Sequence, residues 1–351
     1  MQYNWTYDVV FRLSNYLADP NYFTKCQPEF LDSASRLKLL KGKLDREIAQ
    51  DSVICLQELS IDWAAKLHVY FAQNNYHLVN ASYGKKYDGY MGVGVAYPAL
   101  KYDVVDVDIS RISDTKSIIS LPSYTKETPS LLFKGLVKLL ALFAVKAKRQ
   151  QPDRDVATLQ WDEALRRYNQ MVAVHLKDKT TTDEFFVGTY HMPCAFKTPV
   201  VMSIHCALAA QHLQRLARRA GKAYVLAGDF NVKPTDSMYQ LLTEGSIESN
   251  CLDIPPPLEG DSWEVGVEPM RSAYAVALGR EPDFTNYAQV KEEEPFLDTL
   301  DYIFVSKEWN VDSVLPLPER TDVNGPLPNA VEPSDHVLIG ADLSLGLSRD
   351  Q

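Results

Sequence analysis

The stretch GDFNV, at residues 228–232, follows an apolar run and carries an aspartate and an asparagine two positions apart. A carboxylate can orient and deprotonate a water molecule, and an amide can donate a hydrogen bond to a phosphate oxygen. Side chains two positions apart on an extended chain point to the same side, so Asp229 and Asn231 are expected to project together from a strand end. The alternative is a simple turn, because Asp and Asn are common turn residues and Lys-Pro follows.

Other polar residues end or begin short apolar runs in the same manner. Taken singly, each has a structural explanation: Glu58 as a solvated cap, His191 as a satisfied, half-buried histidine, and Asp301 as the partner of an arginine. Taken jointly, so many strand ends with acids, amides and histidines predict one site. The full set is Asn15, Glu58, His191, Asp229 with Asn231, Asp301, and Asp335 with His336.

The elements that would position these residues are many short strands with helices between some of them. Apolar runs of strand length recur from Val9–Leu13 to Val337–Leu343. Ser33–Gln50 has apolar residues at helical spacing, and Val201–Ala220 does too and stops at Gly221, a good helix terminator. This pattern predicts an α/β sandwich of two sheets packed face to face, with helices outside. We expect one catalytic domain over residues 1–351, with a helical insertion at 123–158.

Composition excludes some functions and compartments. The net charge of −10 is unlike that of a protein that grips long duplex nucleic acid through its phosphates. The five cysteines are odd in number and form no C-x-x-C, which disfavours a disulfide framework or a cysteine zinc site. The first residues lack the pattern of a signal or transit peptide, so we expect a cytoplasmic or nuclear protein if the chain begins at its natural start.

The segment LLFKGLVKLLALFAVKAKRQ, at residues 131–150, is nearly all apolar but is interrupted by lysines. It is too short and too charged to span a bilayer comfortably, so no transmembrane segment is expected. An insertion helix that packs on the body or on a partner subunit is the simplest interpretation. A lid over the site and a membrane-surface helix are the alternatives.

The order of the motifs resembles the endonuclease/exonuclease/phosphatase superfamily, which has the DNase I-like fold. The matching pieces are SNYLAD, CLQEL, TYHM, AGDFNVKP, LDYIFVS and PSDHVLI, and they run from near residue 10 to near residue 342. The pattern SAY, FTN and TLDYIF within residues 272–306 is similar to the branch with poly(A) deadenylases, nocturnin, Angel proteins and 2′,5′-phosphodiesterases. The resemblance implies a four-layer α/β sandwich of two largely antiparallel sheets with helices outside.

The resemblance also implies a mechanism in which Mg²⁺, with Mn²⁺ as a possible substitute, assists water attack on a phosphate ester. Glu58 would ligate the metal, supported by Asn15 and Asp335. Asp229 would orient and deprotonate the water, with Asn231 donating to a phosphate oxygen. The remaining implied catalytic residues are His336, positioned by Asp301, and His191 as a further donor.

Substrate recognition is implied for two residues near the catalytic aspartate. Phe296 matches a phenylalanine that stacks on a base in this branch, although a core or rim aromatic is the alternative. Asn286 either lines the same pocket or caps a turn. The loop HMPCAFKTP differs from the loop expected in deadenylases, so the substrate is less well defined than the reaction class.

We therefore expect a Mg²⁺-dependent phosphodiesterase, foremost a 3′-exoribonuclease acting on single-stranded RNA or oligoadenylate. A phosphatase on a small nucleotide such as NADP is one alternative. A binding protein that kept the fold and lost the chemistry is another, although the intact set of acids, amides and histidines argues against it. Possible further partners are a protein or a membrane surface that contacts residues 131–150.

Overall fold

The computed structural model describes residues 20–83, 91–116, 156–257, 263–323 and 325–346 with their side chains, and residues 5–12 as a backbone strand. Asn15 and residues 123–155 of the expected insertion lie outside the described residues, as does the segment 131–150.

Two six-stranded sheets form the body of the protein. The first has the order β13-β14-β1-β2-β4-β3, with β1 (Trp5–Arg12), β2 (Val53–Gln57), β3 (Tyr76–Tyr83), β4 (Met91–Pro98), β13 (Trp309–Val314) and β14 (Ile339–Leu345). The second has the order β5-β6-β7-β8-β12-β9, with β5 (Tyr102–Arg111), β6 (Gln170–Asp178), β7 (Glu184–His191), β8 (Ala223–Asp229), β9 (Arg271–Ser272) and β12 (Asp301–Val305). Neighbouring strands run antiparallel except β1 with β2 and β7 with β8.

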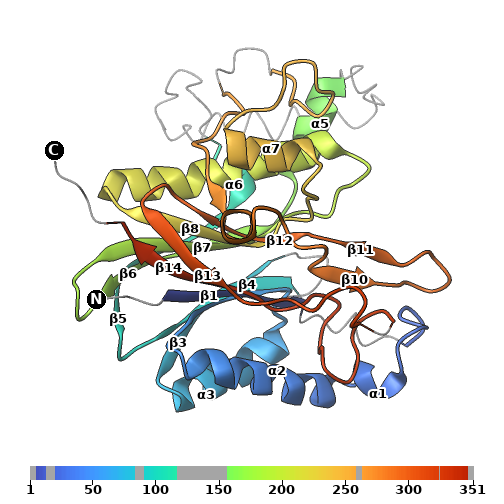
Figure 1. The fold of residues 1–351 in the computed structure, drawn as a ribbon. Coiled ribbons are helices and arrows are strands. Elements are labelled where there is room, and N and C mark those ends of the chain that lie inside the picture. The colour runs from blue at the N-terminus through green and yellow to red at the C-terminus, as the bar shows by residue number, and fades with distance from the viewer. Residues whose placement is uncertain are drawn as a thin grey trace, which may run out of the picture.

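Helices cover the outer face of each sheet, which gives four layers (Figure 1). On the first sheet lie α1 (Pro28–Leu31), α2 (Ser33–Ile48) and α3 (Ile61–Gln73). On the second lie α5 (Val156–Leu165), α6 (Pro199–Ala220) and α7 (Ser237–Glu244). The short helix α8 (Ala273–Leu278) contacts β12 and β13. The predicted four-layer, largely antiparallel sandwich is confirmed.

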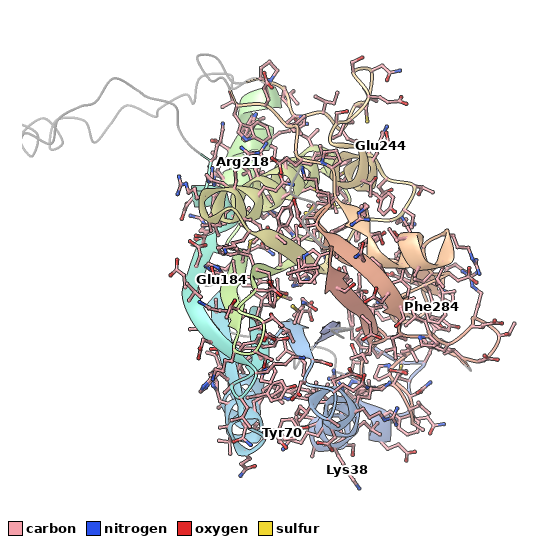
Figure 2. The ribbon with its side chains drawn as sticks, turned by 60° about the vertical axis from the view of Figure 1, so that its left-hand side comes forward. Lys38, Tyr70, Glu184, Arg218, Glu244 and Phe284 are labelled. Carbon is pink, nitrogen blue, oxygen red and sulfur yellow. The ribbon has the colours of Figure 1, made fainter. Side chains whose placement is uncertain are left out.

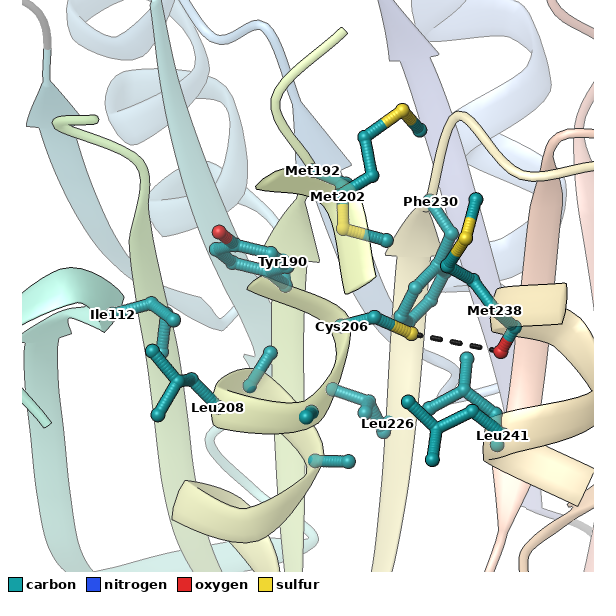
Figure 3. Close-up of a cluster of buried hydrophobic side chains, with 14 of the residues drawn as sticks. Ile112, Tyr190, Met192, Met202, Cys206, Leu208, Leu226, Phe230, Met238 and Leu241 are labelled. Atoms are coloured by element: carbon teal, nitrogen blue, oxygen red, sulfur yellow. Dashed lines mark hydrogen bonds between the residues drawn. The ribbon is translucent and has the colours of Figure 1, made fainter. Parts of the chain in front are cut away.

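Apolar side chains fill all three spaces between the layers. The inner faces of the two sheets meet in one cluster, which includes Val53 and Cys55 of β2 and Val187 of β7. Another cluster joins α6 and α7 to the second sheet, and Figure 3 shows Tyr190, Cys206 and Phe230 meeting in it from different elements. Burial on this scale is the main favourable term in folding.

The predicted helices begin and end close to the expected residues for identifiable physical reasons. Asp32 caps α2 by accepting a hydrogen bond from the Ser35 N–H. Helix α6 has Pro199 in its first turn and ends at Gly221, whose φ of 66° is the left-handed conformation that glycine adopts readily. None of the helices in the described parts of the chain has the length and apolar character needed to cross a membrane.

A small hairpin projects from one end of the sandwich (Figure 1). It consists of β10 (Asn286–Ala288) and β11 (Phe296–Asp298), which pair antiparallel. Its far end packs against the chain before α1, because Ala288 and Val290 contact a cluster of Phe23, Cys26 and Leu31. The hairpin thereby places Phe296 and Asn286 at the end of the sheets where the expected catalytic residues lie.

Candidate active site

Three predicted site residues form one row across the second sheet. His191 of β7 is paired in register with Asp229 of β8, and Asp229 is paired with Asp301 of β12. Residues opposite one another in a sheet point to the same face. This row faces the other sheet, because Val187, Val225 and Ile303, at even spacing from it, lie in the cluster between the sheets.

Gly228 permits the close approach of β7 and β8 beside this row. A Cβ atom built on Gly228 would lie 1.9 Å from the Tyr190 carbonyl oxygen, far inside contact distance. The packing of the two strands therefore requires a glycine at this position of the GDFN motif, independently of any catalytic role of the neighbouring residues.

The expectation that Asp229 and Asn231 project side by side from an extended chain is wrong. The strand ends at Asp229, and Asn231 has a φ of 50°, in the left-handed region. The Asn231 N–H donates to Asp229 Oδ1 at 2.9 Å, which is the turn that was the alternative. This turn fixes the Asp229 carboxylate and leaves Oδ2 facing the site. The Asn231 side chain donates to the Met192 carbonyl at 3.0 Å, and its Oδ1 is buried with no hydrogen-bond partner in the described structure.

Asp301 and His336 form a buried carboxylate–imidazole pair, as predicted from the sequence. His336 Nδ1 donates to Asp301 Oδ2 at 2.7 Å. Thr285 Oγ1 donates to the same Oδ2 at 2.6 Å and holds the carboxylate in position. Burial lowers the pKa of His336, but the charge and hydrogen bond of Asp301, with the charges of Asp335 and Asp229, raise it to about 9 overall. His336 is therefore cationic at neutral pH, and its Nε2 is 4.0 Å from Asp229 Oδ2.

His191 is held from the opposite sheet. Tyr83 of β3 lies with its hydroxyl oxygen 2.8 Å from His191 Nδ1. His191 Nε2 is 3.6 Å from Asp229 Oδ2 and 3.9 Å from Glu58 Oε1. Asn169, just before β6, donates to the His191 carbonyl at 2.8 Å. The imidazole is thus fixed with one nitrogen on a tyrosine and the other directed at two carboxylates.

Glu58 and Asp335 are both buried near this centre. Glu58 directly follows β2 and has a φ of 51°, a conformation that costs free energy for a residue with a long side chain and often marks functional sites. Asp335 lies in the turn before β14, where Ser334 Oγ donates to its Oδ1 at 3.4 Å. The third predicted metal residue, Asn15, lies outside the described residues, so its placement beside these carboxylates stays a prediction.

The charge at this end of the sandwich is suited to a divalent cation. Four buried carboxylates and two buried cations lie here, and four negative charges with two positive ones give a formal charge of −2. The carboxylates are those of Glu58, Asp229, Asp301 and Asp335, and the cations are Arg36 and protonated His336. Hard divalent cations prefer such oxygen ligands. The ligand atoms of Asp229, Asp301 and His336 also lie within 4.8 Å of one another. Asp301 and His336 also bond to each other, through Oδ2 and Nδ1.

The two residues expected to bind substrate have different surroundings. Phe296 is partly exposed, and the Lys233 ammonium lies 5.1 Å from its ring centroid while pairing with Asp298 at 3.1 Å. Asn286 is buried, and its side-chain amide donates to the Asp335 carbonyl at 3.1 Å. Asn286 therefore holds the turn that carries Asp335 and His336, whereas Phe296 is partly exposed beside Lys233.

Several supporting residues were missed by sequence reasoning. Tyr83, Arg36 and Asn169 are not among the residues that the sequence analysis singled out. Thr285 stands in the FTN motif, and its hydroxyl also accepts hydrogen bonds from the Leu300 and Asp301 N–H groups. A polar residue within a recognised motif was the available signal for Thr285, and no comparable local signal exists for Tyr83.

Comparison with known families decides the classification. Residues 21–336 match the model of the Endonuclease/Exonuclease/phosphatase family. The chain belongs to this family. Among curated proteins, it is 35% identical over 160 residues to carbon catabolite repressor protein 4 homolog 4 of Arabidopsis thaliana, covering 42% of this chain and 35% of that protein. It is 28% identical over 185 residues to human 2′,5′-phosphodiesterase 12, covering 49% of this chain and 28% of that protein. The matched segments thus span about a third of these relatives' length.

Solved structures with a similar fold align with nearly the whole of this chain. The structure of ANGEL2, described as a 2′,3′-cyclic phosphatase in complex with adenosine-2′,3′-vanadate, has a TM-score of 0.71 at 18% identity and covers 98% of this chain and 96% of that one. The human nocturnin catalytic domain has a TM-score of 0.61 at 18% identity, covering 99% and 96%. At these identities, the likeness establishes the fold alone.

Proposed function

We propose that this family member is a metal-dependent phosphoric ester hydrolase, and specifically a 3′-exoribonuclease or related phosphodiesterase acting on single-stranded RNA or oligoadenylate. The observation that carries the proposal is the position of Asp229 Oδ2, which faces the Nε2 atoms of His191 and His336 at 3.6 and 4.0 Å. A carboxylate between two imidazoles, beside a cationic histidine, is an arrangement that can activate water against an anionic ester.

Each described residue has a role in this reaction. Asp229 orients the attacking water and accepts its proton, because the Asn231 N–H fixes the other carboxylate oxygen. His336 donates its Nε2–H to a phosphate oxygen and keeps its charge through Asp301. His191 donates a further hydrogen bond as negative charge develops. Preorganised hydrogen-bond donors of this kind make the largest single contribution to transition-state stabilisation in many enzymes.

Glu58 and Asp335 would hold Mg²⁺, with Asn15 as the proposed third ligand and Mn²⁺ as a substitute. When bound, the ion would offset the negative charge of the ester and of the cluster of carboxylates. The fit rests on the buried carboxylate oxygens and the formal charge of −2 described above.

Support for an RNA-like substrate comes from the rim and from the relatives. Phe296 offers an aromatic face on which a base can stack, an interaction worth about 1–3 kcal/mol and tolerant of sequence. One curated relative is a 2′,5′-phosphodiesterase. Another is named a probable CCR4-Not complex 3′-5′-exoribonuclease subunit Ccr4 of Enterocytozoon bieneusi and is 35% identical over 130 residues, which cover 36% of this chain and 25% of that protein. The overall net charge of −10 favours short single strands over long duplexes.

A phosphatase acting on a small nucleotide is the second candidate. Human nocturnin is 26% identical over 176 residues, and the ANGEL2 structure holds an adenosine-2′,3′-vanadate. A single nucleotide would need only the Phe296 face and the catalytic centre, without an extended strand groove.

The test is an assay of the purified protein with five substrates: 5′-labelled oligo(A), 5′-labelled oligo(U), 2′,5′-linked oligo(A), NADP and a 2′,3′-cyclic-phosphate RNA. Each is incubated with Mg²⁺ or with EDTA. Asp229→Asn is the active-site variant, and Asp103→Asn, an exposed aspartate on β5, is the control. A Mg²⁺-dependent ladder shortened from the 3′ end of oligo(A), abolished by Asp229→Asn alone, is expected.

Other outcomes point elsewhere. Phosphate release from NADP or opening of the cyclic phosphate, without shortening of oligo(A), would favour the small-nucleotide phosphatase. Retained binding of oligo(A) with no turnover on any substrate would favour a binding protein of the same fold.

A further inference from the structure

Arg36 is a buried arginine on α2 that lies behind the candidate metal ligands. Its side chain is 1% exposed, its Cζ is 5.5 Å from the centroid of the Trp63 ring, and its Nε donates to the Pro333 carbonyl at 2.7 Å. Burying a guanidinium away from water is costly unless negative charge lies nearby. A group this deep therefore requires a compensating charge.

These contacts of Arg36 are with segments that adjoin the two proposed ligands. Pro333 is two residues before Asp335 in the turn that leads to β14. Trp63 lies in the first turn of α3, which Ser60 caps only two residues after Glu58. One side chain thus joins α2 to the chain on either side of the site.

The compensating charges are those of the proposed ligands themselves. Burial lowers the pKa of Arg36, whereas the Asp335 and Glu58 carboxylates raise it. A guanidinium stays charged under all ordinary conditions. The Arg36 charge consequently attracts both carboxylates from the side of α2, where it also stacks on Trp63.

We propose that Arg36 is the resident counter-charge of the candidate metal site: a positioning residue that holds Glu58 and Asp335 together when no divalent cation is bound. This inference rests on the proposed function, because it assumes that Mg²⁺ binds these carboxylates. Without the guanidinium, two buried carboxylates would repel each other across the site. Bound Mg²⁺ would relieve that repulsion, so Arg36 matters most to the metal-free protein.

A second contact between α2 and the same loop supplies a matched control. Lys43 Nζ pairs with Glu332 Oε1 at 2.7 Å, one residue before Pro333. Lys43→Met breaks this ion pair between the helix and the loop but leaves the charge beside Glu58 and Asp335 unchanged. Lys38, on the same helix, points into solvent and serves as a surface control (Figure 2).

The experiment measures the melting temperature of wild type, Arg36→Met, Arg36→Lys, Lys43→Met and Lys38→Met in EDTA and in saturating Mg²⁺. The readout is the Mg²⁺-induced rise in melting temperature, which does not depend on activity. For Arg36→Met we expect this rise to exceed that of wild type by about 5 °C. For the other three variants, it should match wild type within about 1–2 °C, because a charge remains at position 36.

Different failures have different meanings. If wild type gains no stability from Mg²⁺, the proposed metal site fails and the role of Arg36 fails with it. If wild type responds but Arg36→Met gains the same or less, the counter-charge role alone is overturned and Arg36 is a packing residue. Should Arg36→Met fold only when Mg²⁺ is present, the inference is supported. If it folds under neither condition, Arg36→Lys decides, since a Mg²⁺-induced rise well above wild type would show that charge alone is not what Arg36 supplies.

Discussion

Two neighbouring residues of β7, Tyr190 and His191, each belong to a buried tyrosine–histidine pair, and the two pairs have different surroundings. Tyr190 faces α6, where its hydroxyl bonds to His205 Nδ1 at 2.8 Å, and His205 Nε2 donates to the Ala164 carbonyl at 2.9 Å. The next residue, His191, faces the other sheet and bonds to Tyr83 at the same distance of 2.8 Å. The second nitrogen of His205 meets a backbone carbonyl, whereas that of His191 is directed at Asp229 and Glu58.

The difference shows that burial and a tyrosine partner do not make a histidine functional. Both ring nitrogens of His205 have hydrogen-bond partners, and these partners are compatible with a single tautomer. Because a carbonyl only accepts, Nε2 carries the proton and Nδ1 accepts from Tyr190. His191 instead directs one nitrogen at groups that change charge during the proposed reaction. We therefore expect changes at His191 to affect turnover and changes at His205 to affect stability.

The largest effect is expected for His191→Ala. Loss of a donor that stabilises developing charge should lower kcat by about 10²–10³-fold. The free energy of unfolding should also fall, by about 1–3 kcal/mol, because His191 is buried and its loss takes away a hydrogen-bond partner of the Tyr83 hydroxyl. The value of kcat per folded molecule therefore separates His191 from His205. Steady-state kinetics on the active substrate, with urea unfolding in parallel, test this. A variant that unfolds readily but retains kcat would place His191 with His205 as a structural residue.

His205→Ala should produce the opposite result. It leaves the Tyr190 hydroxyl and the Ala164 carbonyl without their partner inside the cluster of Figure 3, and each such loss costs about 1–3 kcal/mol. We expect the free energy of unfolding to fall by about 3 kcal/mol, with kcat per folded molecule within a factor of two of wild type. A large fall in kcat at full folding would show that the core pair communicates with the site.

The pH dependence of stability offers a separate test of His205. Burial, aided by the charges of Arg167 and Arg111, lowers the pKa of His205 from 6.5 to about 4, against the Ala164 hydrogen bond that raises it. The unfolded chain then binds the proton more tightly than the folded one. The contribution of neutral His205 to the free energy of unfolding is fully present above pH 6.5. It is lost as the pH falls towards 4, and the loss is roughly 3 kcal/mol.

The measurement is urea unfolding of wild type and His205→Gln from pH 7.5 to pH 4. Glutamine does not titrate, so the contribution of His205 is the difference between the two curves. This difference should shrink as the pH falls. Parallel curves would mean that His205 keeps the same affinity for protons in both states, contrary to the buried, neutral histidine described here.

The comparison also explains what the sequence alone could predict. His191, Asp229, Asp301 and His336 each sit in a local motif at the end of an apolar run, so short-range pattern was enough to find them. Tyr83 is 108 residues from His191 and comes from the other sheet. Arg36 is 297 residues from Pro333. Such contacts depend on how the two sheets pack, which no local spacing encodes.

Local backbone geometry was a second feature that the sequence did not predict. The turn at Asp229 and Asn231 depends on a left-handed asparagine, and the same letters are compatible with an extended strand end. His205 shows the converse: it stands within a long helical pattern, and only the contacts to β7 and α5 reveal its partners. The single-domain organisation, the insertion at 123–158 and the placement of Asn15 stay predictions.

The smallest effects are expected when only the two hydroxyls are removed. Tyr83→Phe keeps the ring between the sheets but removes the group that fixes His191 Nδ1, so the imidazole can rotate. We expect kcat to fall about 5–10-fold with KM little changed, consistent with about 1 kcal/mol for one hydrogen bond. Tyr190→Phe should leave kcat unchanged and lower the free energy of unfolding by about 1–2 kcal/mol, because it leaves His205 Nδ1 buried without a donor.

The two phenylalanine variants are measured side by side, by steady-state kinetics and by urea unfolding. They remove the same atom from the same kind of pair, so any difference between them reflects what the paired histidine does. A kcat loss in Tyr83→Phe that is absent in Tyr190→Phe assigns Tyr83 to the positioning of His191. Equal and purely structural effects would mean that the Tyr83 hydroxyl only satisfies a buried nitrogen, and that Asp229 and Glu58 alone set the orientation of the His191 ring.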